Sequence, residues 1–164
     1  MHRIAEFKKV SFEEFAKSFT TENAREIYDN IKLPVRATQG SAGYDFFAPT
    51  DFELKPGETA KIPTGIRARI DDGWVLKIYP RSGLGFKFRL QLDNTVGIID
   101  ADYYNSDNEG HIFIKVTNCS VEGKTVSVKA GDGFAQGIFL PFGITVDDEV
   151  TDVRNGGFGS TDKK

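Results

Sequence analysis

Residues 94–103 read N-T-V-G-I-I-D-A-D-Y and join a short apolar run to two carboxylates. Gly97 permits a tight turn before the run, and Asp100 and Asp102 follow it, two residues apart. Side chains two residues apart share one face of an extended strand, so the spacing predicts that both carboxylates point the same way. An apolar strand that ends in a carboxylate is typical of a segment that delivers a charged group to a site.

Three other stretches contain groups that could act together with such a carboxylate. Residues 80–83, P-R-S-G, predict a tight turn with a cation and a hydroxyl. Residues 131–136, G-D-G-F-A-Q, predict a turn that leads into a strand with an amide. Residues 156–161, G-G-F-G-S-T, form a glycine-rich tail with one aromatic ring and two hydroxyls.

Length and composition indicate one globular domain of 164 residues with a sizeable core. The net charge of −3 argues against a general nucleic-acid binder, and no apolar run is long enough for a membrane span. The N-terminus lacks the apolar core of a signal peptide, so we expect a cytoplasmic protein. The single Cys119 excludes an internal disulfide, no Cys/His cluster has zinc-ligand spacing, and we expect this thiol to be buried.

The first third of the chain differs in pattern from the rest. Residues 1–10 are compatible with an opening strand, and two short helices are predicted within residues 11–33. Ser11 and Glu14 fit a capping box at the start of the first helix. The helices are predicted to pack on the domain surface, with a partner-binding or oligomer contact as the alternative.

From Pro34 onward the sequence indicates short strands separated by glycine turns. The chain has seventeen glycines, which suits many tight turns, and residues 71–73 read as a hairpin turn. Together these features predict an all-β sandwich, jelly roll or barrel. The predicted strands are 41–48, 52–54, 59–66, 66–70, 74–79, 111–116, 124–128, 134–141 and 144–150.

In this order the motifs resemble those of the trimeric dUTPase family, the deoxyuridine triphosphate nucleotidohydrolases. The motifs are A-G-Y-D at 42–45 and the four stretches at 80–83, 94–103, 131–136 and 156–161. The resemblance implies an all-β jelly roll with one or two short N-terminal helices. It also implies three parts: an extension (1–33) packed on the domain, the jelly-roll domain (34–153) and a flexible glycine-rich arm (154–164).

The same resemblance implies an enzyme that hydrolyses dUTP to dUMP and pyrophosphate. With the assistance of Mg²⁺, water would make an in-line attack on the α-phosphate. The reaction would keep uracil out of DNA and supply dUMP. The family resemblance also implies a homotrimer with active sites shared between subunits. We expect no association with a membrane and no direct binding of nucleic acid.

Roles on the nucleoside side follow from the resemblance. Asp100 matches the carboxylate that activates water, and Tyr103 matches the residue that packs under the deoxyribose and rejects a 2′-hydroxyl. Three residues of the central stretch match the hairpin that reads uracil, namely Asn94, Gly97 and Ile99.

On the phosphate side, Arg81, Ser82 and Gly83 match a turn that contacts the triphosphate, and backbone N–H groups in such a turn bind anions. Gln136 matches a residue that bonds a phosphate or a metal-bound water. The Mg²⁺ ion would be held by phosphate oxygens and water, with no direct protein ligand. Asp45 would lie beyond the direct ligands of the ion.

In the tail, Phe158 matches a ring that covers the uracil. Gly159, Ser160 and Thr161 match the groups that hold the γ-phosphate, and Arg154 could add charge. Val153 stands where the family usually has its arm arginine.

Two further departures concern the domain itself. Gly133 stands where many members have arginine, which predicts a missing ion pair or subunit contact, and the polar segment 104–110 is longer than the common connection.

Two alternatives to an ordinary dUTPase remain. A dCTP deaminase shares the fold but uses a glutamate base, and the central stretch offers only aspartates. A regulatory protein that binds dUTP and engages a protein partner is compatible with the same motifs.

Overall fold

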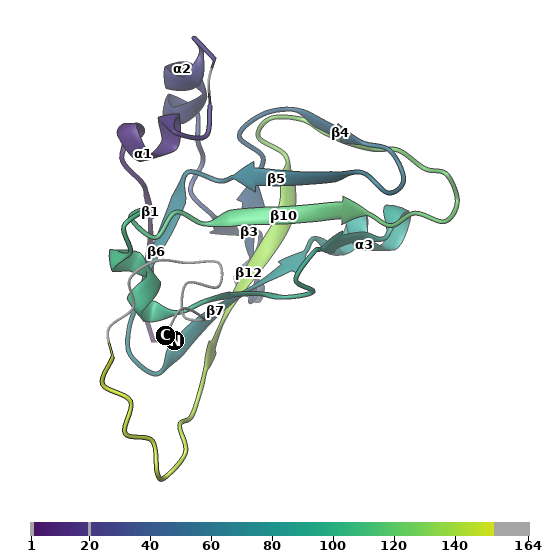
Figure 1. Ribbon diagram of the computed structural model, residues 1–164. Coiled ribbons are helices and arrows are strands. Elements are labelled where there is room, and N and C mark those ends of the chain that lie inside the picture. Colours follow the sequence, from purple (N-terminus) through teal and green to yellow (C-terminus); the bar gives the residue numbers. More distant parts are fainter. Residues whose placement is uncertain (1, 20, 153–164) are drawn as a thin grey trace.

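The computed structural model describes residues 2–19 and 21–152, whose strands all pair antiparallel (Figure 1). The strands group into a five-stranded sheet (β2-β3-β12-β7-β9), a three-stranded sheet (β5-β10-β8) and the pairs β1-β6 and β11-β4. Their bounds are β1 Ala5–Lys9, β2 Val35–Arg36, β3 Tyr44–Phe47, β4 Phe52–Leu54, β5 Thr59–Pro63, β6 Ile66–Ile70, β7 Trp74–Pro80, β8 Leu90–Leu92, β9 Gly97–Ile99, β10 Phe113–Asn118, β11 Val126–Val128 and β12 Gly133–Pro141. The all-β jelly roll predicted from the sequence is confirmed.

Strands β7 and β12 form the centre of the larger sheet, paired from Ala135 opposite Pro80 to Pro141 opposite Trp74. Alternate residues of β7 turn Leu76 and Ile78 into the core, where both are fully buried with Phe46 and Phe134. Each such side chain contributes about 1.5–3 kcal/mol on burial. The core therefore holds β7 and β12 rigidly at the place where the site residues emerge.

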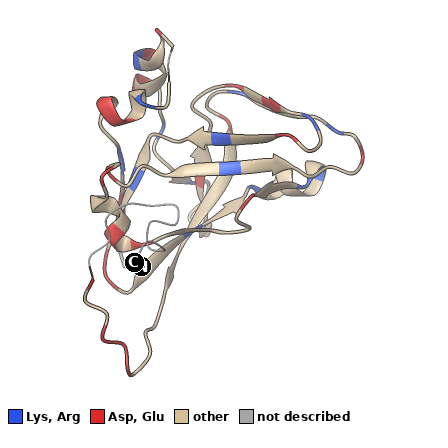
Figure 2. Ribbon diagram, in the orientation of Figure 1, with Lys and Arg blue, Asp and Glu red and all other residues tan. Residues whose placement is uncertain are grey.

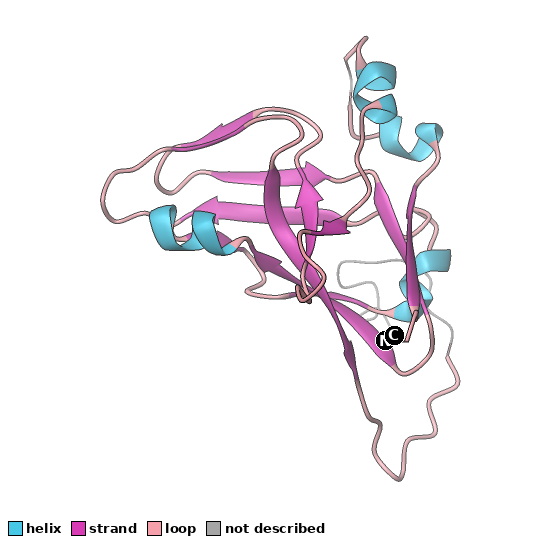
Figure 3. Cartoon of the chain, turned by 180° about the vertical axis from the view of Figure 1, so that it is seen from behind, coloured by secondary structure: helices cyan, strands magenta, loops and turns pink. Residues whose placement is uncertain are grey.

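The N-terminal extension joins the body through both a strand and two helices (Figure 3). Strand β1 pairs with β6, and helices α1 (Phe12–Ala16) and α2 (Ala24–Asp29) follow it. Ser11 caps α1, its hydroxyl accepting from the backbone N of Glu14 at 3.1 Å. The predicted capping box is only half formed, because the backbone N of Ser11 donates to Glu109 at 2.7 Å rather than to Glu14. Phe15 on α1 is fully buried, so the extension shares apolar packing with the domain.

Some predicted elements are wrong or shifted. Residues 144–150 form no strand, and they extend away from the sheets (Figures 1 and 3). The predicted turn at 80–83 is instead the start of helix α3 (Ser82–Phe88). The strands predicted at 41–48 and 111–116 are β3 and β10, which begin at Tyr44 and Phe113.

Two further corrections concern single side chains. Asp100 and Asp102 do not share a strand face, because β9 ends at Ile99 and a 3-10 helix, η1 (Ala101–Asn105), begins after Asp100. Cys119 is half-buried rather than buried.

Residues of both charge signs are spread along the chain (Figure 2). Acidic residues mark α1, α2 and the segment after β12, while basic residues lie on β5, β10 and α3. No helix within residues 2–19 and 21–152 is long and apolar enough to cross a bilayer.

Candidate active site

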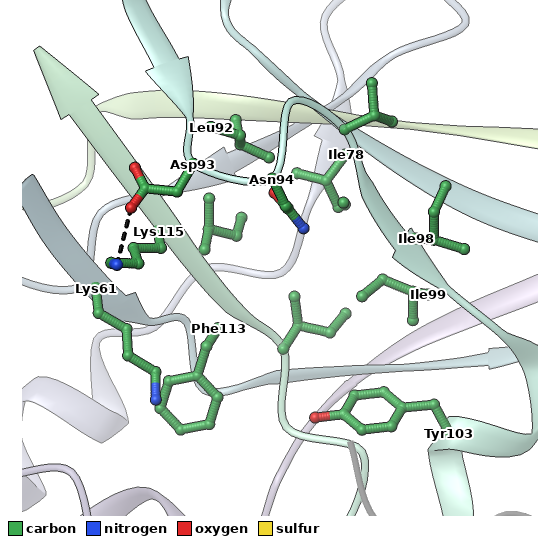
Figure 4. Close-up of a pocket in the computed structure, with 14 residues that line it drawn as sticks. Lys61, Ile78, Leu92, Asp93, Asn94, Ile98, Ile99, Tyr103, Phe113 and Lys115 are labelled. Atoms are coloured by element: carbon green, nitrogen blue, oxygen red, sulfur yellow. Dashed lines mark ion pairs between the residues drawn. The ribbon is translucent and has the colours of Figure 1, made fainter. Parts of the chain in front are cut away.

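A pocket of about 590 Å³ opens beside the turn that joins β8 to β9. This turn is the segment predicted as the uracil-reading hairpin, although β8 pairs with β10 and β9 pairs with β7 rather than with each other. Thr95 in this turn has a left-handed backbone (φ 66°), and Gly97 packs so closely that a Cβ there would lie 3.1 Å from Cβ of Ile78. Figure 4 shows Asn94 on the opposite side of the pocket from Tyr103. The segment thus places an amide and a buried aromatic ring across a cavity that a nucleoside could fill.

Tyr103 forms one wall of this pocket and is held at its hydroxyl. Its side chain is buried, its Oη donates to the backbone O of His111 at 2.8 Å, and Nδ2 of Asn108 donates to the same Oη at 2.8 Å. The ring is therefore fixed at its far end as well as at its backbone.

Asp100 lies at the junction between β9 and η1, half-buried and directly after Ile99 of the pocket. Its backbone O accepts from the backbone N of Tyr103 at 3.2 Å. This bond ties the carboxylate's backbone to the residue that forms the wall, so the two keep a fixed spacing.

Charged and aromatic residues that the sequence did not single out also line the pocket. Lys115 Nζ lies 2.9 Å from Asp93 Oδ2, and Lys61 Nζ lies 4.5 Å from the ring centre of Phe113 (Figure 4). A hydrogen bond from Thr117 and then one from Lys115 lower the pKa of Asp93. Lys61 lies on β5 and the residues from 113 to 117 lie on the paired strand β10, whereas Asp93 directly follows β8. The sequence carried a signal only for residues 113–117, in their alternation.

A second group of predicted residues surrounds the start of α3. Arg81, Ser82 and Gln136 line a shallow pocket of about 540 Å³ together with Tyr79 and exposed Phe86. Gln136 Nε2 donates to the backbone O of Pro80 at 3.2 Å. Gly83 follows within α3 but is not among the described lining residues of this pocket.

Asp45 and Gly133 shape the position of Arg81. Arg81 Nη2 lies 3.4 Å from Asp45 Oδ2, and its Nη1 donates to the backbone O of Gly133 at 3.4 Å. A Cβ at Gly133 would lie 2.8 Å from Nη1 of Arg81. The glycine that departs from the family pattern thus makes room for this guanidinium.

The two groups of residues lie on opposite faces of one sheet. Ile78 lines the pocket beside the β8–β9 turn, whereas the next residue, Tyr79, lines the pocket beside α3. Successive side chains of a strand point to opposite faces, so the two pockets have no described lining residue in common. Asp100 is not among the described lining residues of either pocket, and Arg154, Phe158, Gly159, Ser160 and Thr161 fall outside the described residues.

The side chains of residues 2–19 and 21–152 include no group of three or more His, Cys, Asp or Glu that could hold a metal ion. A divalent cation with a protein cage is therefore not built from this part of the chain. An ion held chiefly by ligand oxygens and water fits the same side chains.

Comparison with known proteins gives a consistent result. The dUTPase family model matches residues 29–162. The deoxyuridine 5'-triphosphate nucleotidohydrolase of Lactococcus lactis subsp. lactis (strain IL1403) is 45% identical over 134 residues, which is 80% of this chain and 88% of that relative.

Two solved structures extend the comparison to the fold. The crystal structure of dUTPase from Streptococcus mutans aligns with a TM-score of 0.65 at 36% identity, covering 87% of this chain and 98% of that one. A mutant dUTPase from phage phi11 of S. aureus, which coordinates a structural Mg(II) ion, aligns with a TM-score of 0.65 at 22% identity over 92% of this chain and 98% of that one.

Proposed function

Because this chain belongs to the dUTPase family and hydrolyses dUTP to dUMP and pyrophosphate, we propose that Asp100 activates the attacking water. The observation that carries the proposal is the position of Asp100, one residue beyond Ile99 of the nucleoside-sized pocket. A carboxylate there accepts a proton as water oxygen bonds to the α-phosphorus. The bond from that phosphorus to the bridging oxygen breaks, and pyrophosphate leaves.

The pocket beside the β8–β9 turn is the proposed nucleoside site. Asn94 and the backbone of Gly97 and Ile99 pair with the uracil edge, which leaves polar groups unpaired when the base is cytosine. Tyr103 packs under the sugar, where a 2′-hydroxyl would meet the fixed ring.

The pocket beside α3 is the proposed triphosphate site. Arg81 supplies a cation and Ser82 a hydroxyl, the backbone N–H of Gly83 adds a donor, and Gln136 supplies an amide. Asp45 does not contact the phosphates itself but orients Arg81 through the 3.4 Å ion pair.

Mg²⁺ fits this site as an ion that travels with the substrate. Phosphate oxygens and water are its proposed ligands, as suits a cation that dehydrates reluctantly. When bound, the ion neutralises phosphate charge and aligns the α-phosphate for attack. Gln136 and Arg81 hold the phosphates around it.

We propose that a complete site needs more than one subunit of a homotrimer. The nucleoside and triphosphate pockets lie on opposite faces of the β7–β12 sheet, so one chain cannot offer both to one substrate. Phe86 beside one pocket is 92% exposed and Ile98 beside the other is 51% exposed, which fits burial against another copy. The arm residues Arg154, Phe158, Gly159, Ser160 and Thr161 are proposed to close over a neighbouring site.

The proposal for Asp100 is tested by Asp100→Asn. This variant keeps the size of the side chain but cannot accept the proton, so we expect dUTP binding within about threefold of wild type and turnover lower by at least about 100-fold. Asp102→Asn, an exposed change two residues away, is the matched control and should retain turnover. Equal effects of the two substitutions, or loss of dUTP binding in Asp100→Asn, would refute the role.

A further inference from the structure

The segment 104–110 after Tyr103 is folded against that residue rather than projecting as a free loop. Gly110 has a left-handed backbone (φ 70°), and a Cβ there would lie 2.7 Å from the backbone O of Tyr103 and 2.8 Å from Cα of Tyr104. Glu109 also has a positive φ of 58°. These two conformations turn the chain back so that residue 108 reaches the phenol of Tyr103.

Asn108 uses its whole amide in this turn. Its Nδ2 donates to Oη of Tyr103 at 2.8 Å, and its Oδ1 accepts from the backbone N of Gly110 at 3.1 Å. Its backbone O accepts from the backbone N of His111 at 3.0 Å, and the backbone O of His111 accepts from Tyr103 Oη at 2.8 Å. The three residues therefore form a closed ring of hydrogen bonds around the hydroxyl.

The N-terminal extension holds this segment from outside. Ser11 donates to Glu109 twice, from its backbone N at 2.7 Å and from its hydroxyl at 2.6 Å. Burial acts to raise the pKa of Glu109, but these bonds and the charge of Arg67 outweigh it and lower that pKa. The guanidinium of Arg67 lies 3.6 Å from the ring centre of Tyr104 and donates to the backbone O of Tyr104. The segment is thus anchored on both sides of Asn108.

We propose that Asn108 is a positioning residue that fixes Tyr103 and thereby sets the discrimination between deoxyribose and ribose nucleotides. The inference rests on the role of Tyr103 in the proposed function. Without a donor from residue 108, the phenol loses its hydrogen bond from Nδ2 of Asn108 and its ring can tilt. A tilted ring leaves more space for a 2′-hydroxyl, so UTP gains relative to dUTP.

The substitution Asn108→Asp isolates the bond to the phenol. A carboxylate still accepts from the backbone N of Gly110, so the turn is kept, but it cannot donate to Tyr103. The loss of one hydrogen bond predicts a fall of about 3- to 10-fold in the ratio of kcat/KM for dUTP to kcat/KM for UTP. Asn105→Asp introduces the same charge at an exposed position of the same segment and should leave the ratio unchanged.

A second pair of variants separates this effect from general loosening of the loop. In a Tyr103→Phe background the hydroxyl is absent, so Asn108→Asp should change the ratio no further. An equal fall in the ratio in both backgrounds, or equal ratios for Asn108→Asp and Asn105→Asp, would overturn the inference.

Tyr103→Ala distinguishes the inference from its premise. If Tyr103→Ala leaves the ratio unchanged, the sugar-wall role of Tyr103 is wrong, and the inference falls with it. If Tyr103→Ala lowers the ratio and Asn108→Asp does not, only the role of Asn108 is wrong.

Discussion

His111, whose backbone O accepts from Tyr103 Oη, shows how burial controls the ionisation of a single side chain. Its ring is fully buried, and its Nε2 accepts from the backbone N of Gly65 at 2.9 Å, so the proton of the neutral ring lies on Nδ1. Nδ1 faces Oε1 of Glu14 at 3.7 Å, which is beyond hydrogen-bond range. Burial lowers the pKa of His111 from 6.5 to about 4, and the nearby charge of Glu14 opposes this without reversing it.

This shift predicts a loss of stability in mild acid. Between pH 6.5 and about 4 the unfolded chain protonates His111 while the folded chain keeps it neutral, so the free energy of unfolding falls as pH falls. The full shift corresponds to about 3 kcal/mol. Urea unfolding of His111→Gln, which retains an acceptor for Gly65, should show a shallower pH slope than wild type. His2→Gln, at an exposed histidine, should keep the wild-type slope, and a wild-type slope in His111→Gln would contradict the account.

At the scale of residues, the motif singled out Asp100 and Tyr103, and their roles stay predictions. The predicted shared face of Asp100 and Asp102 was wrong, because the chain leaves the extended conformation after Ile99. The contact of Asn108 with Tyr103 could not be predicted, since it depends on positive φ at Glu109 and Gly110.

At the scale of elements, the turn between β5 and β6 is where the N-terminal helices dock. Gly65 in this turn has φ 70°, and a Cβ there would lie 2.4 Å from Cδ1 of Ile31 and 3.1 Å from Cδ2 of Phe15. The backbone N of Val10 also donates to the backbone O of Gly65 at 3.0 Å. The extension and the domain therefore meet at a position that only glycine fits.

Gly65→Ala is predicted to destabilise the protein for two reasons, and Gly73→Ala for only one. Gly73 has φ 79° with nothing within 4 Å of an added Cβ, so alanine there costs about 1–2 kcal/mol from the backbone alone. At Gly65 the clash with Ile31 and Phe15 adds about 1–3 kcal/mol. Urea unfolding at one protein concentration measures the free energy of unfolding of both variants. Equal losses of stability would show that the helices move aside from the added Cβ at no energetic cost.

Elements whose signals lie in a few neighbouring residues were predicted well. Elements that depend on pairing with a distant part of the chain were not. The capped helix α1 and the turn at 71–73 carry their signals in a few neighbouring residues. The turn forms no hairpin, however, because β6 pairs with β1 and β7 pairs with β9 and β12. The alternation in 144–150 suggested a strand, but a strand needs a neighbour to bond, and within the described residues this segment has none. Helix α3 was missed because its glycines read as a turn.

At the scale of the whole molecule, the central result is the separation of the two half-sites. Strand β7 turns Ile78 toward the pocket proposed for the nucleoside and Tyr79 toward the pocket proposed for the triphosphate. The resemblance to a trimeric family predicted shared sites, and the pairing of β7 with β9 and β12 adds a physical argument for that proposal. No local pattern in the sequence specifies that pairing.

Mixing two inactive variants tests this separation most directly. Asp100→Asn damages the nucleoside half and Arg81→Ala the triphosphate half, and the two chains are unfolded and refolded together at equal concentration. In random trimers about one site in four then combines two intact halves, so we predict recovery of about a quarter of wild-type dUTP turnover. A mixture of Asp100→Asn with Tyr103→Ala, both in the nucleoside half, should recover nothing. Turnover in the first mixture no greater than the sum of its separate parents would contradict a site shared between subunits.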